Sequence, residues 1–152
     1  MQLREAIYRY ANYQERCHSE VRNKLYELGA ATPEVNEMIA ELIEKGILNE
    51  ERFAKGIARG KFRMKQWGRK KIVQQLKQKQ VSDYCIKKAL QEIDADEYDA
   101  VLHKLTTQKW EELKKERSMP AKKMKTMRYM LQKGYESDLI LTIIKDLEAK
   151  RK

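Results

Sequence analysis

The chain has 152 residues and a net charge of +10 at pH 7, with 37% charged and 8% aromatic residues, six glycines and two prolines. This size fits one or two compact units, and the composition is typical of a helical, charge-rich soluble protein. No run approaches the roughly 18 apolar residues of a membrane span, and the N-terminus MQLREAIYRY does not resemble a signal peptide, so we expect a cytoplasmic protein without membrane contact.

Charge alternates in blocks along the chain. Residues 1–51 have a net charge of −4, residues 52–82 of +11 without any acidic residue, residues 83–113 of −4 and residues 114–134 of +7. Like charges this dense repel one another on a helix. We therefore predict that a polyanionic partner outside the fold neutralises the two basic segments. The alternative is a solvated surface screened by salt.

A helix–turn–helix pattern occurs three times, with turns at Gly29, Gln80 and Gly134, which are 51 and 54 residues apart. Apolar residues stand four positions before each turn residue and six, nine, ten and thirteen positions after it, as expected for one face of a helix. Another helical stretch precedes each pair, at residues 3–13, 51–65 and 97–117. The sequence predicts an all-α fold of three tandem three-helix repeats in an elongated, curved array, at residues 1–48, 49–95 and 96–152.

Local signals at the turns agree with these repeats. Gly29 and Gly134 suit the left-handed residue that follows a helix, whereas Gln80 departs from this pattern and predicts a turn that is either tighter or slightly strained. Three residues after each turn residue stand side chains that cap a helix N-terminus, and we predict that they do so here: Thr32, Asp83 and Ser137. Breaks at Trp67–Gly68 and at residues 118–120 divide the helices of the second and third repeats.

The central segment GILNEERFAKGIARGKFRMKQWGRKKIVQQLKQKQVSDYCIKKAL, residues 46–90, resembles the RecX family of regulatory proteins. The elements that carry the resemblance are Gly46-Ile47-Leu48, Glu51-Arg52-Phe53-Ala54, the basic run, Gly68 before Ile72, Leu76 and Lys79, then Ile86 and Ala89-Leu90. The earlier Val21-x3-Leu25-x2-Leu28-Gly29 is similar to the family's first repeat. Gln80 departs from the glycine usual in the family.

This resemblance implies a function as well as a fold. The family is not enzymatic and needs no cofactor. It binds the RecA nucleoprotein filament in its helical groove and inhibits extension, ATP hydrolysis, strand exchange and coprotease activity, which links it to homologous recombination, DNA repair and the SOS response. We expect a monomer with this partner. One alternative is a sequence-independent DNA-binding protein, with single- or double-stranded DNA as its ligand. Another is a scaffold that binds no nucleic acid.

Two cationic sets are the candidate contact residues for a filament or DNA. The first set lies in the second repeat and comprises Arg59, Lys61, Arg63, Lys65, Arg69, Lys70 and Lys71. The second set lies in the third repeat and comprises Lys122, Lys123, Lys125 and Arg128. Trp67 stands between two basic runs, where it either stacks on a base or partner or, as indole rings more often do, packs into its own domain.

Other residues point to structure rather than chemistry. We expect Trp110 in the core, and core packing is favoured over a binding surface for Met119, Met124, Met127 and Met130. Cys17 and Cys85 are predicted to be buried or incidental thiols in a reducing compartment. His18 and His103 lack a third ligand at metal spacing, and no catalytic motif occurs, so neither a metal site nor an active site is expected.

Overall fold

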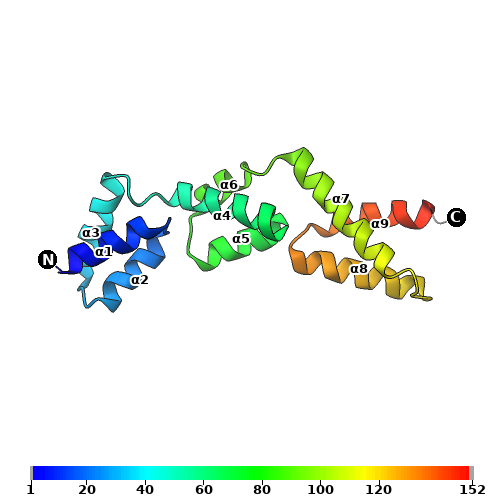
Figure 1. Ribbon diagram of the computed structural model, residues 1–152, viewed down its shortest axis with the longest axis horizontal. Helices are drawn as coiled ribbons and strands as arrows, with labels where there is room; N and C mark the ends of the chain where they lie inside the picture. The colour runs from blue at the N-terminus through cyan, green and yellow to red at the C-terminus, as the bar shows by residue number, and fades with distance from the viewer. Residues whose placement is uncertain (1, 151–152) are drawn as a thin grey trace. The chain divides into compact units, whose positions relative to one another are not determined.

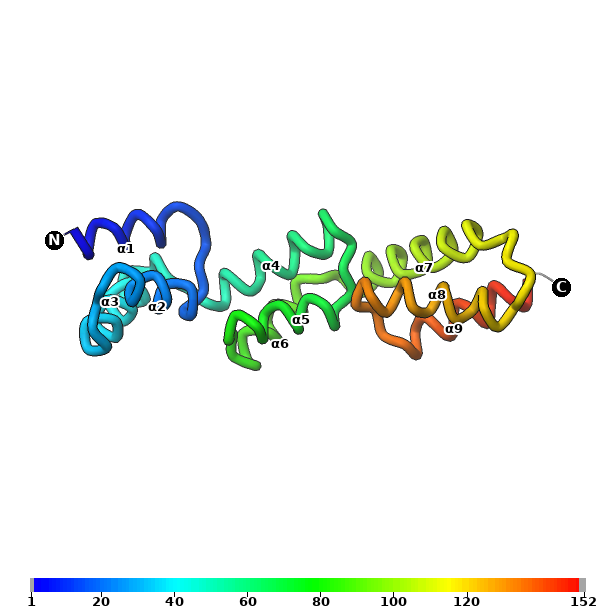
Figure 2. The backbone as a smooth tube through the Cα atoms, turned by 90° about the horizontal axis from the view of Figure 1, so that it is seen from below, coloured from blue at the N-terminus to red at the C-terminus, as the bar shows by residue number. Residues whose placement is uncertain are grey.

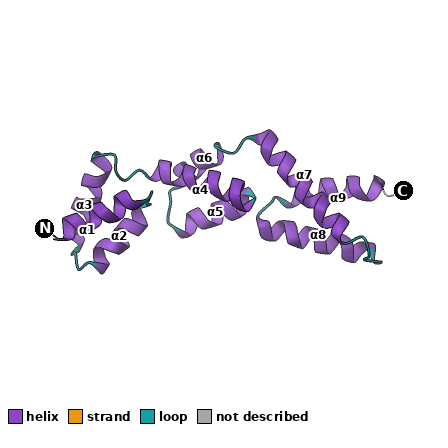
Figure 3. Cartoon of the chain, viewed as in Figure 1, coloured by secondary structure: helices purple, strands orange, loops and turns teal. Residues whose placement is uncertain are grey.

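The structure, a computed structural model, describes residues 2–150. Within these residues the chain forms nine helices and no strands, which confirms the predicted all-α class (Figure 3). None of the helices in this range is both long and apolar enough to span a membrane. The helices, labelled in Figure 1, are α1 (Gln2–Tyr13), α2 (His18–Glu27), α3 (Thr32–Glu44), α4 (Glu50–Lys65), α5 (Arg69–Gln78), α6 (Asp83–Leu90), α7 (Ala95–Glu112), α8 (Met119–Lys133) and α9 (Ser137–Lys150).

The chain separates into two compact units, and two of the three boundaries between them fall inside helices α4 and α5. Unit 1 comprises Met1–Arg59 with Gln75–Glu92, and unit 2 comprises Gly60–Gln74 with Ile93–Lys152. Helices α4 and α5 therefore each contribute residues to both units. The division into three repeats at residues 1–48, 49–95 and 96–152 follows the chain rather than these units and stays a prediction.

In unit 1, helices α1, α2 and α3 pack against one another (Figure 2). Their apolar faces supply a shared core that includes Ile7, Leu25, Val35 and Leu42, and Leu48 beyond α3 closes it. The apolar spacing at positions 35, 39 and 42 is the helical period on which the sequence prediction was based. The first helix–turn–helix pair and the helix before it thus form one packed group.

The start of α2 is tied to the turn after α5 within unit 1. The Ser19 hydroxyl donates to the Lys79 carbonyl at 2.6 Å, and the Lys79 ammonium pairs with Glu20 at 3.1 Å. Cys17 lies buried beside them, and burial raises the pKa of its thiol. A buried, protonated thiol is a poor nucleophile, in agreement with the structural role predicted for Cys17.

In unit 2, helices α7, α8 and α9 lie side by side (Figures 1 and 2). Tyr98 and Leu102 of α7, Met130 of α8 and Ile140 of α9 are buried between them. Trp110 is 3% exposed, as predicted for a core residue. The end of α4 joins this unit through Phe62, whose ring centroid lies 5.8 Å from that of Tyr98.

The turn residues adopt the predicted left-handed conformation, but the caps differ by about one residue. The φ angles of Gly29 and Gly134 are 93° and 100°. In α6 the cap is Ser82, whose side chain accepts from the Cys85 N–H, so the prediction of Asp83 as the cap is wrong.

The other two predicted caps also begin their helices. Residue 31, an alanine without a capping side chain, precedes α3, and the Thr32 hydroxyl bonds Tyr26 at 3.0 Å instead. Ser137 is the first residue of α9. A capping residue lies just outside the helix, and turn spacing alone does not locate the helix start to one residue.

Gln80 takes a φ of 61°, so of the two alternatives for this turn, tighter or strained, the structure has the strained one. A side chain in the left-handed region costs about 1–2 kcal/mol relative to glycine. We therefore expect Gln80→Gly to raise the free energy of unfolding by roughly 1 kcal/mol, measured by chemical denaturation. Gln74→Gly, at an exposed interior position of α5, is the matched control and should lower it by about 1 kcal/mol. Destabilisation by both changes would contradict strain at Gln80.

Candidate functional site

The first cationic set occupies the end of α4, the following turn and the start of α5. Except for Arg59, its residues fall in the stretch Gly60–Gln74, which belongs to unit 2 with α7, α8 and α9. Arg59 lies in unit 1 and pairs with Glu92 at 2.6 Å. The position of the other cations depends on how this stretch is held against the rest of unit 2.

Two glycines hold the α4–α5 turn against the α8–α9 turn. The Gly68 N–H donates to the Lys133 carbonyl at 2.7 Å, and the Lys70 N–H donates to the Gly134 carbonyl at 2.9 Å. A Cβ atom on Gly68 would lie 2.3 Å from the carbonyl carbon of Gly134. No side chain fits at that distance, so only glycine permits this approach of the two backbones.

Tyr98 of α7 also stabilises this contact between the α4–α5 and α8–α9 turns, which we call the Tyr98 junction. Its hydroxyl accepts the Arg69 N–H at 3.0 Å and donates to Glu136 at 2.6 Å, and the Arg69 side chain pairs with the second oxygen of Glu136 at 3.0 Å. Burial, together with the hydrogen bond to Glu136, raises the pKa of Tyr98, so its hydroxyl stays protonated near neutral pH. The Arg69 guanidinium stacks on the Tyr98 ring at 3.8 Å. Arg69 therefore has a structural role that its sequence position does not reveal.

Gln66 and Tyr135 extend the junction by one more contact. The Tyr135 hydroxyl donates to the Gln66 carbonyl at 2.7 Å, and the Tyr135 ring lies 5.2 Å from that of Tyr98. Gln66 has a φ of 56°, a conformation uncommon for a side chain. These contacts set the direction in which the chain enters Trp67.

Trp67 is half-buried, and two ammonium groups lie close to its ring. The Lys71 nitrogen is 4.5 Å and the Lys61 nitrogen 5.0 Å from the centre of its ring. We call Trp67, Lys61, Lys71 and Lys133 the Trp67 cluster. Burial lowers the pKa of Lys133, and the nearby positive charge of Lys71 adds to this shift by repulsion. An anion bound at this cluster would relieve that repulsion.

Nothing in the sequence marks Lys133 as a contact residue. Its nitrogen donates to the Lys65 carbonyl at 3.3 Å, across 68 positions of the sequence. In the sequence, its neighbour Gly134 indicates only the end of a helix. The close approach of Gly134 to Gly68 is what brings Lys133 to the first cationic set.

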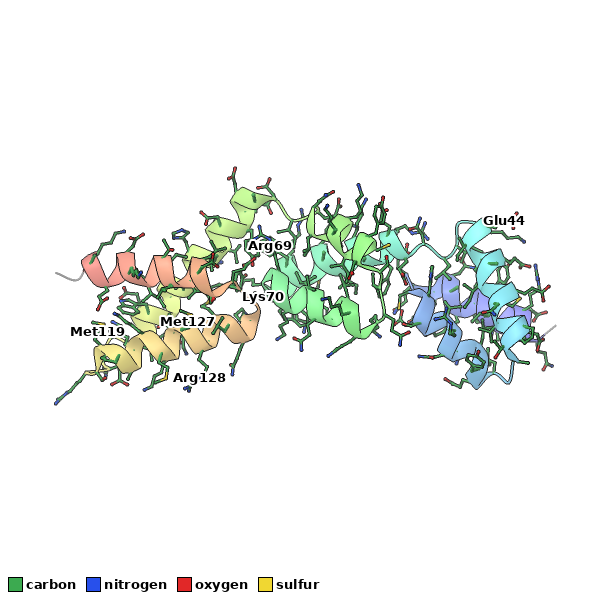
Figure 4. The ribbon with its side chains drawn as sticks, turned by 180° about the vertical axis from the view of Figure 1, so that it is seen from behind. Glu44, Arg69, Lys70, Met119, Met127 and Arg128 are labelled. Carbon is green, nitrogen blue, oxygen red and sulfur yellow. The ribbon has the colours of Figure 1, made fainter. Side chains whose placement is uncertain are left out.

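Three further members of the first set are exposed on the helices beside the cluster. Arg63, Lys65 and Lys70 make no ion pair with any acidic residue among residues 2–150. Figure 4 shows Lys70 next to Arg69 at the start of α5. Unlike Arg59 and Arg69, these cations are available to an external anion.

The second cationic set offers much less unpaired charge. Lys122 is 4% exposed, and its nitrogen lies 4.1 Å from the centre of the Trp110 ring, so it has almost no surface for a partner. Lys123 pairs with Glu148 at 2.7 Å and Lys125 with Glu116 at 2.6 Å. Only Arg128 of this set is exposed without an ion pair to residues in the described range. The acidic partners lie in distant segments, which counting charges by block does not reveal.

An aromatic ring with two ammonium groups close to it suits two kinds of partner. The indole can stack on a nucleobase while the lysines contact phosphates, or the lysines can pair with acidic side chains of a protein. In both cases the contacts made by the ammonium groups are electrostatic and weaken with salt. Neither needs a catalytic group or a metal.

Comparison with known proteins places this arrangement in a family. The family models for the second and third three-helix domains of RecX match residues 49–90 and 96–144. The regulatory protein RecX of Clostridium perfringens (strain 13 / Type A) is 32% identical over 133 residues, which are 87% of this chain and 62% of that protein. This chain therefore spans less than two thirds of that relative. The regulatory protein RecX of Pelodictyon phaeoclathratiforme is 30% identical over 123 residues, 80% of this chain and 74% of that protein.

Solved structures show the same fold. The crystal structure of RecX from Lactobacillus salivarius is 26% identical and superposes with a TM-score of 0.86, covering 97% of this chain and 96% of that one. A crystal structure of another regulatory protein RecX, 21% identical, has a TM-score of 0.81 and covers 95% and 72% of the two chains. With models for two of its three-helix domains matching in order and relatives named alike, this chain belongs to the RecX family of regulatory proteins.

Proposed function

We propose that this protein binds the RecA–single-stranded DNA filament and inhibits its extension, ATP hydrolysis, strand exchange and coprotease activity. Family membership supports the regulatory role, and the Trp67 cluster is the observation that supports the mode of binding. The proposal implies a monomer that works in the cytoplasm, where recombination and DNA repair are controlled. In it the protein acts by occupying the filament rather than by chemistry.

The contact surface in this proposal is the Trp67 cluster with Arg63, Lys65 and Lys70. These cations have no acidic partner in the described part of the chain, so an anionic surface can neutralise them without breaking an internal ion pair. A groove of a nucleoprotein filament presents phosphates and acidic side chains close together. Arg59, Arg69, Lys123 and Lys125 contribute less, because each would first have to leave its own carboxylate.

The alternative function is sequence-independent DNA binding by the same residues. The position of Trp67 between Lys61 and Lys71 favours it, because stacking of a base on an indole is tolerant of sequence. Charge alone does not separate the two functions. Stoichiometry does, because a filament regulator acts at far less than one molecule per RecA, whereas a DNA-binding competitor must cover the DNA.

We expect Lys61→Glu/Lys70→Glu/Lys71→Glu to raise the concentration for half-inhibition of RecA's DNA-dependent ATP hydrolysis by roughly tenfold or more, because three attractive contacts become repulsive. The change avoids Arg69, whose loss would disturb the Tyr98 junction. The measurement is the steady-state ATPase rate of preformed filaments at substoichiometric amounts of this protein. Circular dichroism checks that the helices persist.

The matched control is Lys77→Glu/Lys87→Glu/Lys104→Glu, which makes the same change in net charge at exposed positions outside the cluster. It should retain most of the inhibition. Equal loss in both variants would mean that net charge, not this surface, matters. If the wild-type protein inhibits only at amounts that coat the DNA in a direct binding assay, the DNA-binding alternative is correct.

A further inference from the structure

A second surface, distinct from the Trp67 cluster, lies on one face of α8. Met124, Met127, Arg128, Leu131 and Gln132 line a surface groove with a volume of about 420 Å³. Met124 is 55% and Leu131 43% exposed. Figure 4 labels Met127 and Arg128 on this helix. Large apolar side chains exposed together are uncommon on a surface that has no partner.

The spacing of these residues forms a continuous stripe along the helix. Positions 127 and 128 follow position 124 by three and four residues, and position 131 follows them by four and three, so the four side chains lie on one face. Met130 and Thr126 of the same helix are fully buried. The methionines therefore divide: Met130 packs in the core as predicted, whereas Met124 is exposed and Met127 lines the groove.

The charged residues of α8 around this groove are all basic, and two of its lysines are already paired with carboxylates of other segments. Helix α8 contains no acidic residue. Lys123 and Lys125 are paired with Glu148 and Glu116, whereas Arg128, in the groove itself, has no ion pair with another residue of the range 2–150. A partner that covers the groove must bury apolar surface and supply a carboxylate to Arg128.

We propose that this α8 groove docks an acidic amphipathic helix of another protein. Apolar residues of such a helix, spaced three and four apart, fit between Met124, Met127 and Leu131, because the rows of side chains on one helix fill the grooves of another. Methionine side chains adapt to differently shaped partners. A Glu or Asp on the flank of the incoming helix pairs with Arg128. This inference concerns other side chains than the filament proposal and does not depend on it.

The physical features of the groove favour this occupant over others. A symmetric contact with α8 of a second copy of this chain would bring Arg128 and the other basic residues of α8 against the same positive charge. Nucleic acid would leave the methionine and leucine side chains facing phosphates, without apolar groups to bury them. An acidic amphipathic helix satisfies both the apolar stripe and the unpaired guanidinium.

The test uses the full chain and a fluorescein-labelled synthetic peptide of about 18 residues, long enough to become helical when bound. The peptide has leucines at helical spacing and glutamates on both flanks. One control peptide has lysines in place of the glutamates, and another has the acidic sequence scrambled. We expect fluorescence anisotropy to show binding of the acidic helix only. Leu131→Glu should weaken that binding by at least tenfold.

Arg128→Glu separates charge recognition from apolar burial. It should weaken binding of the acidic peptide about tenfold and strengthen that of the lysine peptide, while Lys87→Glu leaves both unchanged. Equal binding of the acidic and scrambled peptides, or no binding, would overturn the proposal. So would a dimer in light scattering that Leu131→Glu dissociates, or tighter binding to anionic phosphatidylserine vesicles than to the acidic peptide. RecA inhibition is scored in a separate assay, so failure of one proposal leaves the other intact.

Discussion

We expect Gly68→Ala to be among the most damaging single substitutions in this protein, lowering the free energy of unfolding by roughly 3 kcal/mol. The added Cβ would lie 2.3 Å from the carbonyl carbon and 2.4 Å from the carbonyl oxygen of Gly134. Both are backbone atoms, which cannot rotate away as a side chain can. Relief requires the α4–α5 turn to separate from the α8–α9 turn, with loss of the two backbone hydrogen bonds between them. Thermal unfolding should show a fall of about 10 °C in Tm.

Gly60→Ala is the matched control for this change. Gly60 belongs to the same unit and lies inside α4, and a Cβ there would have no atom within 4 Å. Alanine has the higher helix propensity, so Gly60→Ala should stabilise the protein by about 0.5–1 kcal/mol. We therefore expect the changes in the free energy of unfolding of the two variants to have opposite signs. A Gly68→Ala protein as stable as the wild type would show that the two backbones do not approach this closely.

The second large effect is expected at Tyr98, where Tyr98→Ala should lower the free energy of unfolding by about 4 kcal/mol. The substitution removes a buried ring that contacts Phe62 and Tyr135, together with the hydroxyl between Arg69 and Glu136. Tyr98→Phe isolates the hydroxyl. It should cost roughly 1–3 kcal/mol, because the Glu136 carboxylate and the Arg69 N–H lose a buried partner. Urea denaturation of the series measures both values.

The difference in the free energy of unfolding between the wild type and Tyr98→Phe should depend on pH in a way that provides an internal check. The pKa of Tyr98 is raised in the folded state, so the stability that its protonated hydroxyl contributes is fully present below the unfolded-state pKa of about 10. The difference between wild type and Tyr98→Phe should be constant through neutral pH and should change only at higher pH. Tyr84→Phe, at an exposed tyrosine, should be neutral throughout. A cost that varies between pH 6 and 8 would point to another titrating group.

The helices and their turns could be predicted from the sequence because their signals are local. Apolar spacing of three and four residues marks the buried faces, and Gly29 and Gly134 end their helices with positive φ angles. Even Gln80, the exception in sequence, takes the same conformation as the two glycines. A single helix and its turn are enough to establish such features.

The candidate site was only partly predictable because pairing between charges is not local. Arg59, Arg69 and Lys123 lie in segments with few or no acidic residues, yet their carboxylate partners are 33, 67 and 25 positions away. Packing between helices determines which of these side chains form ion pairs, and the packing angles do not follow from the periodicity of the sequence. For the same reason Lys133 was missed, and Lys122 was expected at a surface although it is buried.

The aromatic junction of unit 2 also bears on how this chain can be divided or recombined. A fragment that began at residue 96 would lack Phe62, Gln66 and Arg69, and would present the rings of Tyr98 and Tyr135 to water. Such a fragment would be prone to aggregate, although it contains all three helices of the last repeat. Gene fusions and deletions that cut the chain at the boundary between the second and third repeats would therefore yield a poorly folded product. A viable breakpoint has to keep residues 60–74 with the C-terminal segment.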